Sequence, residues 1–250
     1  MNYAYLIVEG PHDAAFVAKI LKFAGLQQIR LHGDVHPFWV PIIPTTFPHK
    51  GDLLKRVPVP SFHQNADHSI AIHVAGGDAN IPQAIEESLL RIGKDTLSAV
   101  GVILDSDAHG PQKRFADLVP GLTQLISHWP ATAGIVHPGP PRTGIFVLPD
   151  NQNPGTLEEL LLESAAELWP QTLQLAEEYV ATASKTLSAP ELKKPAGKYK
   201  ATVASISNLL RPGKAVQVSI QDDDWLSDST LRLPSLQVLQ SFLHELLALP

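Results

Sequence analysis

Cysteine is absent from all 250 residues of the sequence, which excludes disulfide bonds, thiolate metal sites and cysteine nucleophiles. The sequence also lacks an apolar run long enough to cross a bilayer, and its first residues show no basic region followed by a signal-peptide core. We therefore expect a cytoplasmic protein that makes no use of the membrane. The eleven histidines match no structural zinc pattern, and no Gly-x-Ser-x-Gly elbow marks a serine hydrolase.

Basic residues are fewer than acidic ones, 19 against 25, so the formal net charge is −6. This balance excludes a protein that coats nucleic acid through bulk positive charge. It is compatible with an enzyme that meets phosphates locally, through metal ions and a few Lys or Arg side chains. With 250 residues, 44% of them hydrophobic, the chain is long enough to form one domain with a sizeable core.

The most informative stretch is an apolar, β-branched run that ends in two carboxylates, Asp105 and Asp107. Residues 98–104 are predicted to form a buried parallel strand, and side chains alternate along a strand, so both acids can project to one side. Neighbouring carboxylates repel each other, and a divalent cation is a common relief at the carboxyl end of an α/β sheet. The alternative is an Asp-Ser-Asp turn with both acids in water.

The first predicted strand, residues 3–8, is also followed by acids. Glu9 terminates this strand, and Gly10 after it allows a close backbone approach. Asp13 lies in the first turn of a predicted helix that ends at Gly25. The helix macrodipole favours an acid at that position, so helix capping is the alternative role of Asp13.

A later strand, residues 144–149, leads into Asp150, and the helix predicted over residues 157–169 carries Glu158. Thr156 and Glu159 form a capping-box pattern at the start of this helix. Parallel strands joined by right-handed crossovers place their carboxyl ends at one edge of the sheet. We therefore expect the acids at these ends to form a metal site of oxygen ligands, which suits Mg²⁺ or Mn²⁺. The candidate metal ligands are Glu9, Asp13, Asp105, Asp107, Asp150 and Glu158.

Basic residues that could meet the phosphate groups of a substrate occur in two places. Residues 26–69 are predicted to be a loop-rich insertion, either a structured lid or an oligomer contact. The candidate phosphate-binding residues are Lys50, Lys55 and Arg56 in this insertion, and Lys113 and Arg114 shortly after Asp107. Solvated surface ion pairs are the alternative role for such residues.

Two motifs together resemble a known family. The first is residues 5–13, in which Glu9-Gly10 ends a strand before a helix, and the second is Asp105-Ser106-Asp107 at the end of a later strand. They resemble the Toprim domain, which is shared by topoisomerases, bacterial primases, recombination mediators and the overcoming-lysogenization-defect nucleases. The resemblance implies that Glu9 is a metal ligand or general acid/base and that Asp105 and Asp107 are metal ligands.

The nuclease branch of that family carries further residues that have counterparts here. An acid four residues after the Glu fits Asp13, and acids after a later strand fit Asp150 and Glu158. A basic residue often follows the core, and Lys198 or Lys200 fits this role, in which it would stabilise transition-state charge as a catalytic residue.

The expected fold class is α/β, with a Rossmann-like Toprim core whose mostly parallel central sheet is flanked by helices. We expect this core to cover about residues 1–25 and 70–168 of a single domain. The loop-rich insertion at 26–69 and a helical, basic C-terminal extension at 169–250 complete it.

The resemblance implies a Mg²⁺-dependent phosphodiester hydrolase, a nuclease that acts on DNA or RNA. One alternative is a metal-dependent phosphatase or phosphotransferase on a small phosphorylated molecule, which the acidic net charge favours. The other is a non-catalytic module that binds nucleic acid or docks a partner. Homo-oligomerisation and a separate partner protein remain open.

Overall fold

The computed structural model describes residues 1–48, 51–54 and 59–250. Within these residues the chain forms one seven-stranded sheet in the order β2-β3-β4-β1-β5-β7-β6. The strands are β1 (Asn2–Val8), β2 (Gln27–Ile29), β3 (Ser61–Gln64), β4 (His68–Val74), β5 (Ala99–Asp105), β6 (Val136–His137) and β7 (Arg142–Leu148). The strands predicted at residues 3–8, 98–104 and 144–149 match β1, β5 and β7 to within about two residues.

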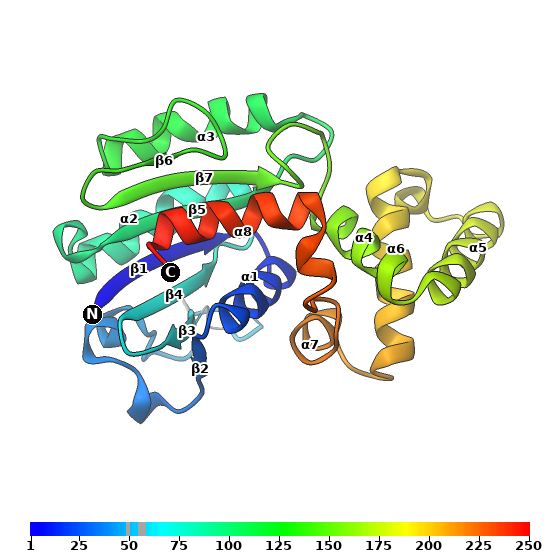
Figure 1. Ribbon diagram of the computed structural model, residues 1–250, viewed down its shortest axis with the longest axis horizontal. Coiled ribbons are helices and arrows are strands. Elements are labelled where there is room, and N and C mark those ends of the chain that lie inside the picture. The colour runs from blue at the N-terminus through cyan, green and yellow to red at the C-terminus, as the bar shows by residue number, and fades with distance from the viewer. Residues whose placement is uncertain (49–50, 55–58) are drawn as a thin grey trace.

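The four central strands β4, β1, β5 and β7 are parallel, whereas β2, β3 and β6 join antiparallel at the two edges. The predicted α/β class with a mostly parallel sheet is therefore confirmed. In the register, Val8 pairs with Val74 on one side and with Ile103 on the other. The carboxyl ends of all four strands consequently lie along one edge of the sheet, from which the chain leads to α4 (Leu157–Leu168) (Figure 1).

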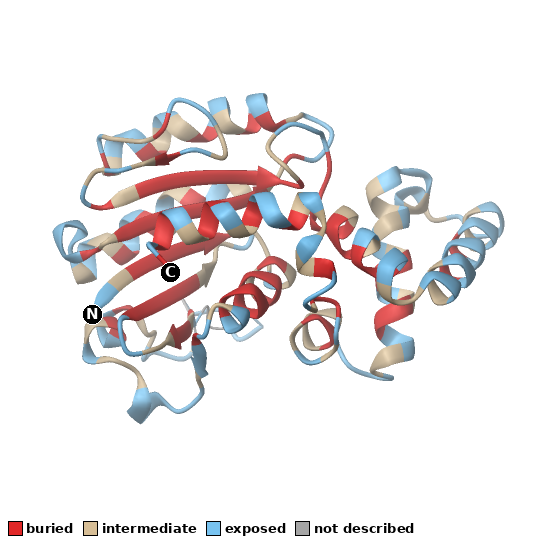
Figure 2. Ribbon diagram, in the orientation of Figure 1, coloured by how far each residue is buried: buried red, intermediate tan, exposed pale blue. Residues whose placement is uncertain are grey.

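Helices cover both faces of the sheet, because each central strand is apolar on both sides. Helices α1 (Pro11–Phe23) and α8 (Pro234–Leu247) pack on one face, and α2 (Ile81–Ile92) and α3 (Pro111–Leu125) pack on the other. Along β1, Leu6 and Val8 belong to the first core, and Tyr5 and Ile7 belong to the second. The central strands are accordingly buried along most of their length (Figure 2).

Helix α8 approaches the sheet closely where two strands carry glycine. A Cβ atom added at Gly101 of β5 would lie 2.4 Å from the Cδ2 atom of Leu246. One added at Gly144 of β7 would lie 2.7 Å from the Cε2 atom of Phe242. Both glycines therefore act by leaving room for the C-terminal helix.

The segment 26–69 is built into the sheet, to which it contributes β2, β3 and the first residues of β4. Between β2 and β3, residues Pro37–Ile42 form a 3₁₀ helix whose Trp39 is fully buried. The indole Nε1 of Trp39 donates a hydrogen bond to the Oγ atom of Ser69, 2.9 Å away. This segment therefore extends the sheet and also covers one of its faces.

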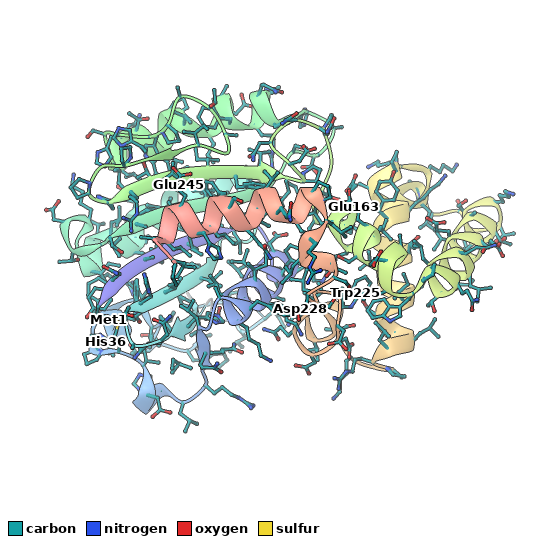
Figure 3. The ribbon with its side chains drawn as sticks, viewed as in Figure 1. Met1, His36, Glu163, Trp225, Asp228 and Glu245 are labelled. Carbon is teal, nitrogen blue, oxygen red and sulfur yellow. The ribbon has the colours of Figure 1, made fainter. Side chains whose placement is uncertain are left out.

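The C-terminal third is helical, as predicted. It contains α5 (Pro170–Thr186), α6 (Pro195–Leu210), α7 (Val216–Asp222) and α8, and α5 and α6 lie beyond the carboxyl edge of the sheet (Figure 1). Trp225, at the base of α6 and α7 (Figure 3), is fully buried and meets Trp169 edge-on with ring centroids 5.2 Å apart. Across the described ranges, no helix combines the length and the apolar character that a membrane span requires.

Candidate functional site

The candidate site lies where β1 and β5 end side by side. Glu9 directly follows β1, and Asp105 is the last residue of β5. The Oδ1 atom of Asp105 accepts a hydrogen bond of 2.9 Å from the backbone N–H of Leu157, the first residue of α4. That helix also has the predicted capping box, in which the Glu159 carboxylate accepts from the N–H of Thr156 at 2.8 Å. The carboxylate of Asp105 is therefore turned toward the N-terminus of α4, where the helix dipole favours it.

Two further carboxylates are buried beside Asp105. Asp13 of α1 is 6% exposed, and its Oδ2 atom accepts from the N–H of Gly10 at 2.7 Å, so the predicted capping role is present. Glu158 of α4 is 4% exposed, and its Oε2 atom has no hydrogen-bond partner among the residues described. Both carboxylates act on Asp105 as like charges. We call Asp13, Asp105 and Glu158 the inner acids.

The pKa values of these acids record how unfavourable their charges are. Burial raises the pKa of Asp13 to about 7, and the charges of Glu9 and Glu158 oppose its ionisation further. Burial, then repulsion from Asp13, Glu158 and Glu9, raises the pKa of Asp105 well above its ordinary value. Burial also raises the pKa of Glu9, although Arg114 counteracts part of the shift. Such a cluster needs protons or a cation to be stable.

Arg114 of α3 is the cation that lies against the other acids. Its Nε atom donates to the backbone oxygen of Asp105 at 2.8 Å, and the guanidinium is only 9% exposed. One terminal nitrogen lies 3.2 Å from Oε2 of Glu9 and 3.7 Å from Oδ2 of Asp107. The other terminal nitrogen is paired with the carboxylate of Asp78. We call Glu9, Asp78 and Asp107 the outer acids.

The guanidinium of Arg114 thus forms ion pairs with carboxylates of the protein, which was the alternative role, and its phosphate contact stays a prediction. Its neighbour Lys113 lies outside the site and forms an exposed ion pair of 2.7 Å with Asp117. The sequence analysis missed Asp78, although this residue follows the Gly76-Gly77 turn after β4 and so also lies at the carboxyl edge. The predicted phosphate ligands Lys50, Lys55 and Arg56 lie outside the described residues.

The turn between Asp105 and Asp107 is tied to the loop before α4. The backbone N–H of Asp107 donates to the oxygen of Gly155 at 2.8 Å, and the N–H of Gly155 donates to Oγ of Ser106 at 2.6 Å. Asp107 adopts a left-handed conformation with φ of 50°, which Asp tolerates better than most residues. Because α4 begins two residues after Gly155, this cross-link holds Glu158 near Asp105.

Asp150 makes its contacts elsewhere. Its Oδ1 atom accepts from the N–H groups of Gln152 and Asn153 at 2.9 and 2.7 Å, and its Oδ2 atom accepts from the side chain of Asn153 at 2.6 Å. These local hydrogen bonds hold the pKa of Asp150 below its usual range despite some burial. Asp150 lines a surface pocket of about 610 Å³ together with Glu163 of α4 (Figure 3). The structure therefore gives it no contact with the inner or outer acids.

Of the two lysines predicted to follow the core, Lys200 acts electrostatically on the site. Both Lys198 and Lys200 are exposed on α6. The charge of Lys200 lowers the pKa of Asp13 and, together with burial, that of His12. Lys200 is therefore the basic side chain beyond the core that stands near the inner acids.

The site fits a hard divalent cation by the chemistry of its donors. Within residues 1–48, 51–54 and 59–250, no three His, Cys, Asp or Glu side chains are already arranged as metal ligands. The inner acids nevertheless combine the half-buried carboxylate of Asp105 with two buried ones, and Oε2 of Glu158 has no hydrogen-bond partner among the described residues. Oxygen donors of this kind match the preference of Mg²⁺ and Mn²⁺. Asp13, Asp105 and Glu158 are the residues that would hold such an ion.

Comparisons with known proteins agree on the extent of the domain. The model of a protein family described as "Protein of unknown function (DUF3226)" matches residues 3–248. The solved structure "Crystal structure of hypothetical protein PH0156 from Pyrococcus horikoshii OT3" is similar with a TM-score of 0.59 at 15% sequence identity. The similarity covers 98% of this chain and 95% of that chain, and at this identity it shows a shared fold alone. No curated protein matches the sequence.

Proposed function

We propose that this chain, which belongs to the DUF3226 family, is a Mg²⁺- or Mn²⁺-dependent phosphodiester hydrolase of the Toprim type that acts on DNA or RNA. The observation that carries the proposal is the grouping of Asp105 with the buried carboxylates of Asp13 and Glu158 at the carboxyl edge of the sheet. A protein that only docked a partner would gain nothing from retaining this repulsion. An ion held there restores the charge balance and supplies Lewis-acid stabilisation to a reacting phosphate.

The remaining steps belong to side chains of the protein. The side chain of Glu9 is 25% exposed, so its carboxylate is accessible for proton exchange, and burial raises its pKa above the ordinary value. Glu9 would take a proton from the attacking water or return one to the leaving oxygen. Arg114 holds the Glu9 carboxylate in place at 3.2 Å. Lys200 would stabilise the negative charge that develops on the phosphoryl oxygens.

A polyanionic substrate is supported by the local charge of α6. The net charge of the chain is −6, yet Lys198 and Lys200 stand exposed on this helix, and Lys200 acts electrostatically on Asp13. Positive side chains beside a carboxylate centre allow a protein that is acidic overall to contact a phosphodiester backbone.

The test is cleavage of plasmid and single-stranded DNA and RNA in Mg²⁺ or Mn²⁺. The variants are Glu9→Gln and Asp105→Asn. Matched controls are Glu245→Gln on the exposed side of α8 and Asp228→Asn on the surface before α8 (Figure 3). We expect metal-dependent cleavage that both site variants lose and both controls keep.

Three other outcomes would contradict the proposal in different ways. Cleavage that survives both site variants would place the activity elsewhere. Metal binding without cleavage would favour a phosphatase acting on a small phosphorylated molecule. Neither binding nor cleavage would favour a docking module.

A further inference from the structure

The acids at the carboxyl edge fall into two halves that differ in charge balance. The outer acids surround a buried guanidinium, and each has a carboxylate oxygen within 4 Å of Arg114. The inner acids have no Lys or Arg within ion-pair distance among the described residues, and Oε2 of Glu158 has no hydrogen-bond partner. One half therefore already contains a cation, whereas the other half lacks one.

Asp105 lies between the two halves and presents a different group to each. Its carboxylate faces the inner half, where Oδ1 accepts from the N–H of Leu157. Its backbone oxygen faces the outer half, where it accepts from Nε of Arg114 at 2.8 Å. The guanidinium is thus anchored to the main chain of β5 as well as to carboxylates. A ligand that replaced the guanidinium in the outer half would have to break this hydrogen bond.

We propose that Arg114 takes the place of a second divalent cation, so that the acidic centre binds one ion, held by Asp13, Asp105 and Glu158. This inference rests on the metal-binding part of the proposed function. Arginine stays protonated at every accessible pH, so its charge is a permanent part of the outer half. A divalent ion beside it would meet like-charge repulsion from this guanidinium, whose side chain is only 10% exposed. In the inner half, by contrast, an ion would meet three carboxylates and would satisfy the unpartnered oxygen of Glu158, while the charge of Lys200 acts on Asp13 without forming an ion pair within 4 Å among the described residues.

The test counts bound Mn²⁺ per chain by electron paramagnetic resonance of the free ion, in wild type and in three variants. Arg114→Gln removes the guanidinium charge, Glu158→Gln removes an inner ligand, and Lys113→Gln removes a neighbouring charge from an exposed ion pair. We expect one ion in wild type and in Lys113→Gln, and two in Arg114→Gln, the second in the outer half. We expect Glu158→Gln to weaken binding of the single ion by about tenfold or more.

The inference can be overturned without Arg114→Gln, so the test does not depend on that variant being folded. Two ions in wild type, or one ion that Glu158→Gln binds unchanged, would refute it. A folded Arg114→Gln variant that still binds one ion would refute the role of Arg114. Absence of binding in every protein would overturn both this inference and the metal-dependent function. One bound ion without nucleic-acid cleavage would support the inference while refuting the nuclease.

Discussion

Asp13 allows the cost of the buried charges to be measured directly. Its pKa is raised to about 7 in the folded protein, against an ordinary value of 3.8. Between these values the folded state holds a proton that the unfolded state has released, so the free energy of unfolding falls as pH rises through this window. The interval from pH 5 to the folded pKa spans about two units, which corresponds to roughly 3 kcal/mol. Because Asp13 titrates together with Asp105, this figure is an upper bound.

Asp13→Asn removes the charge and keeps an oxygen that can accept from the N–H of Gly10. We expect the metal-free variant to gain stability relative to wild type as pH rises from 5 to 8, by up to roughly 3 kcal/mol. The assay is urea unfolding in the presence of a chelator at both pH values. The comparison between variant and wild type isolates the neighbourhood of Asp13, because groups elsewhere in the fold, such as His63 and His73, whose pKa values are lowered by burial, titrate alike in both proteins.

Asp150→Asn provides a control of opposite sign, because local hydrogen bonds lower the pKa of Asp150. This group favours the folded state above its unfolded pKa, so its removal should cost stability at pH 8 and matter less in acid. The reasoning would be refuted if Asp13→Asn gained nothing between pH 5 and 8. Adding Mn²⁺ at pH 8 should stabilise wild type more than Asp13→Asn. Asp13 is a proposed ligand, and an ion that binds only the folded state raises the free energy of unfolding.

Two further substitutions probe the packing that positions the site. Gly101→Ala puts a methyl group 2.4 Å from Cδ2 of Leu246, and we expect the free energy of unfolding to fall by about 1–3 kcal/mol in urea; an unchanged midpoint would contradict this close approach. Tyr5→Phe removes a buried hydroxyl that lies 2.6 Å from Oγ of Ser88, and we expect a loss of about 1–2 kcal/mol. Tyr179→Phe on the exposed side of α5 should change stability by less than about 0.5 kcal/mol, and equal losses in the two tyrosine variants would argue against the buried hydrogen bond.

The parts of the fold that could be predicted from sequence are those encoded by local patterns. Strands β1 and β5 are continuous apolar runs that end in acids, and parallel pairing then brings Glu9 close to Asp105. Thr156 and Glu159 marked the start of α4 for a similarly local reason. Strands β2 and β3 were missed, because three or four residues with several polar side chains show no measurable periodicity. Their pairing depends on partners distant in the sequence.

The contacts of Arg114 and Asp150 depend on tertiary packing and on turn geometry, respectively. Arg114 contacts three carboxylates only because α3 packs on the face of the sheet next to α2, and no spacing in the sequence reports this. Asp78, by contrast, could have been included from its place in the turn that follows β4. Asp150 could have been assigned to its loop from the residues that follow it, since Asp at the start of a polar turn commonly accepts from the next backbone N–H groups.

The position of α8 has a consequence for the order in which the protein acquires its structure during synthesis. Helix α8 spans Pro234–Leu247, yet it covers β5 and β7, which the ribosome makes about one hundred residues earlier. One face of β5, which ends in Asp105, and of β7 beside it therefore lacks the cover of α8 while the intervening chain is being translated. Apolar strands exposed in this way are prone to aggregate. Complete burial of β5 and β7 must therefore wait until residues 234–247 have left the ribosomal tunnel.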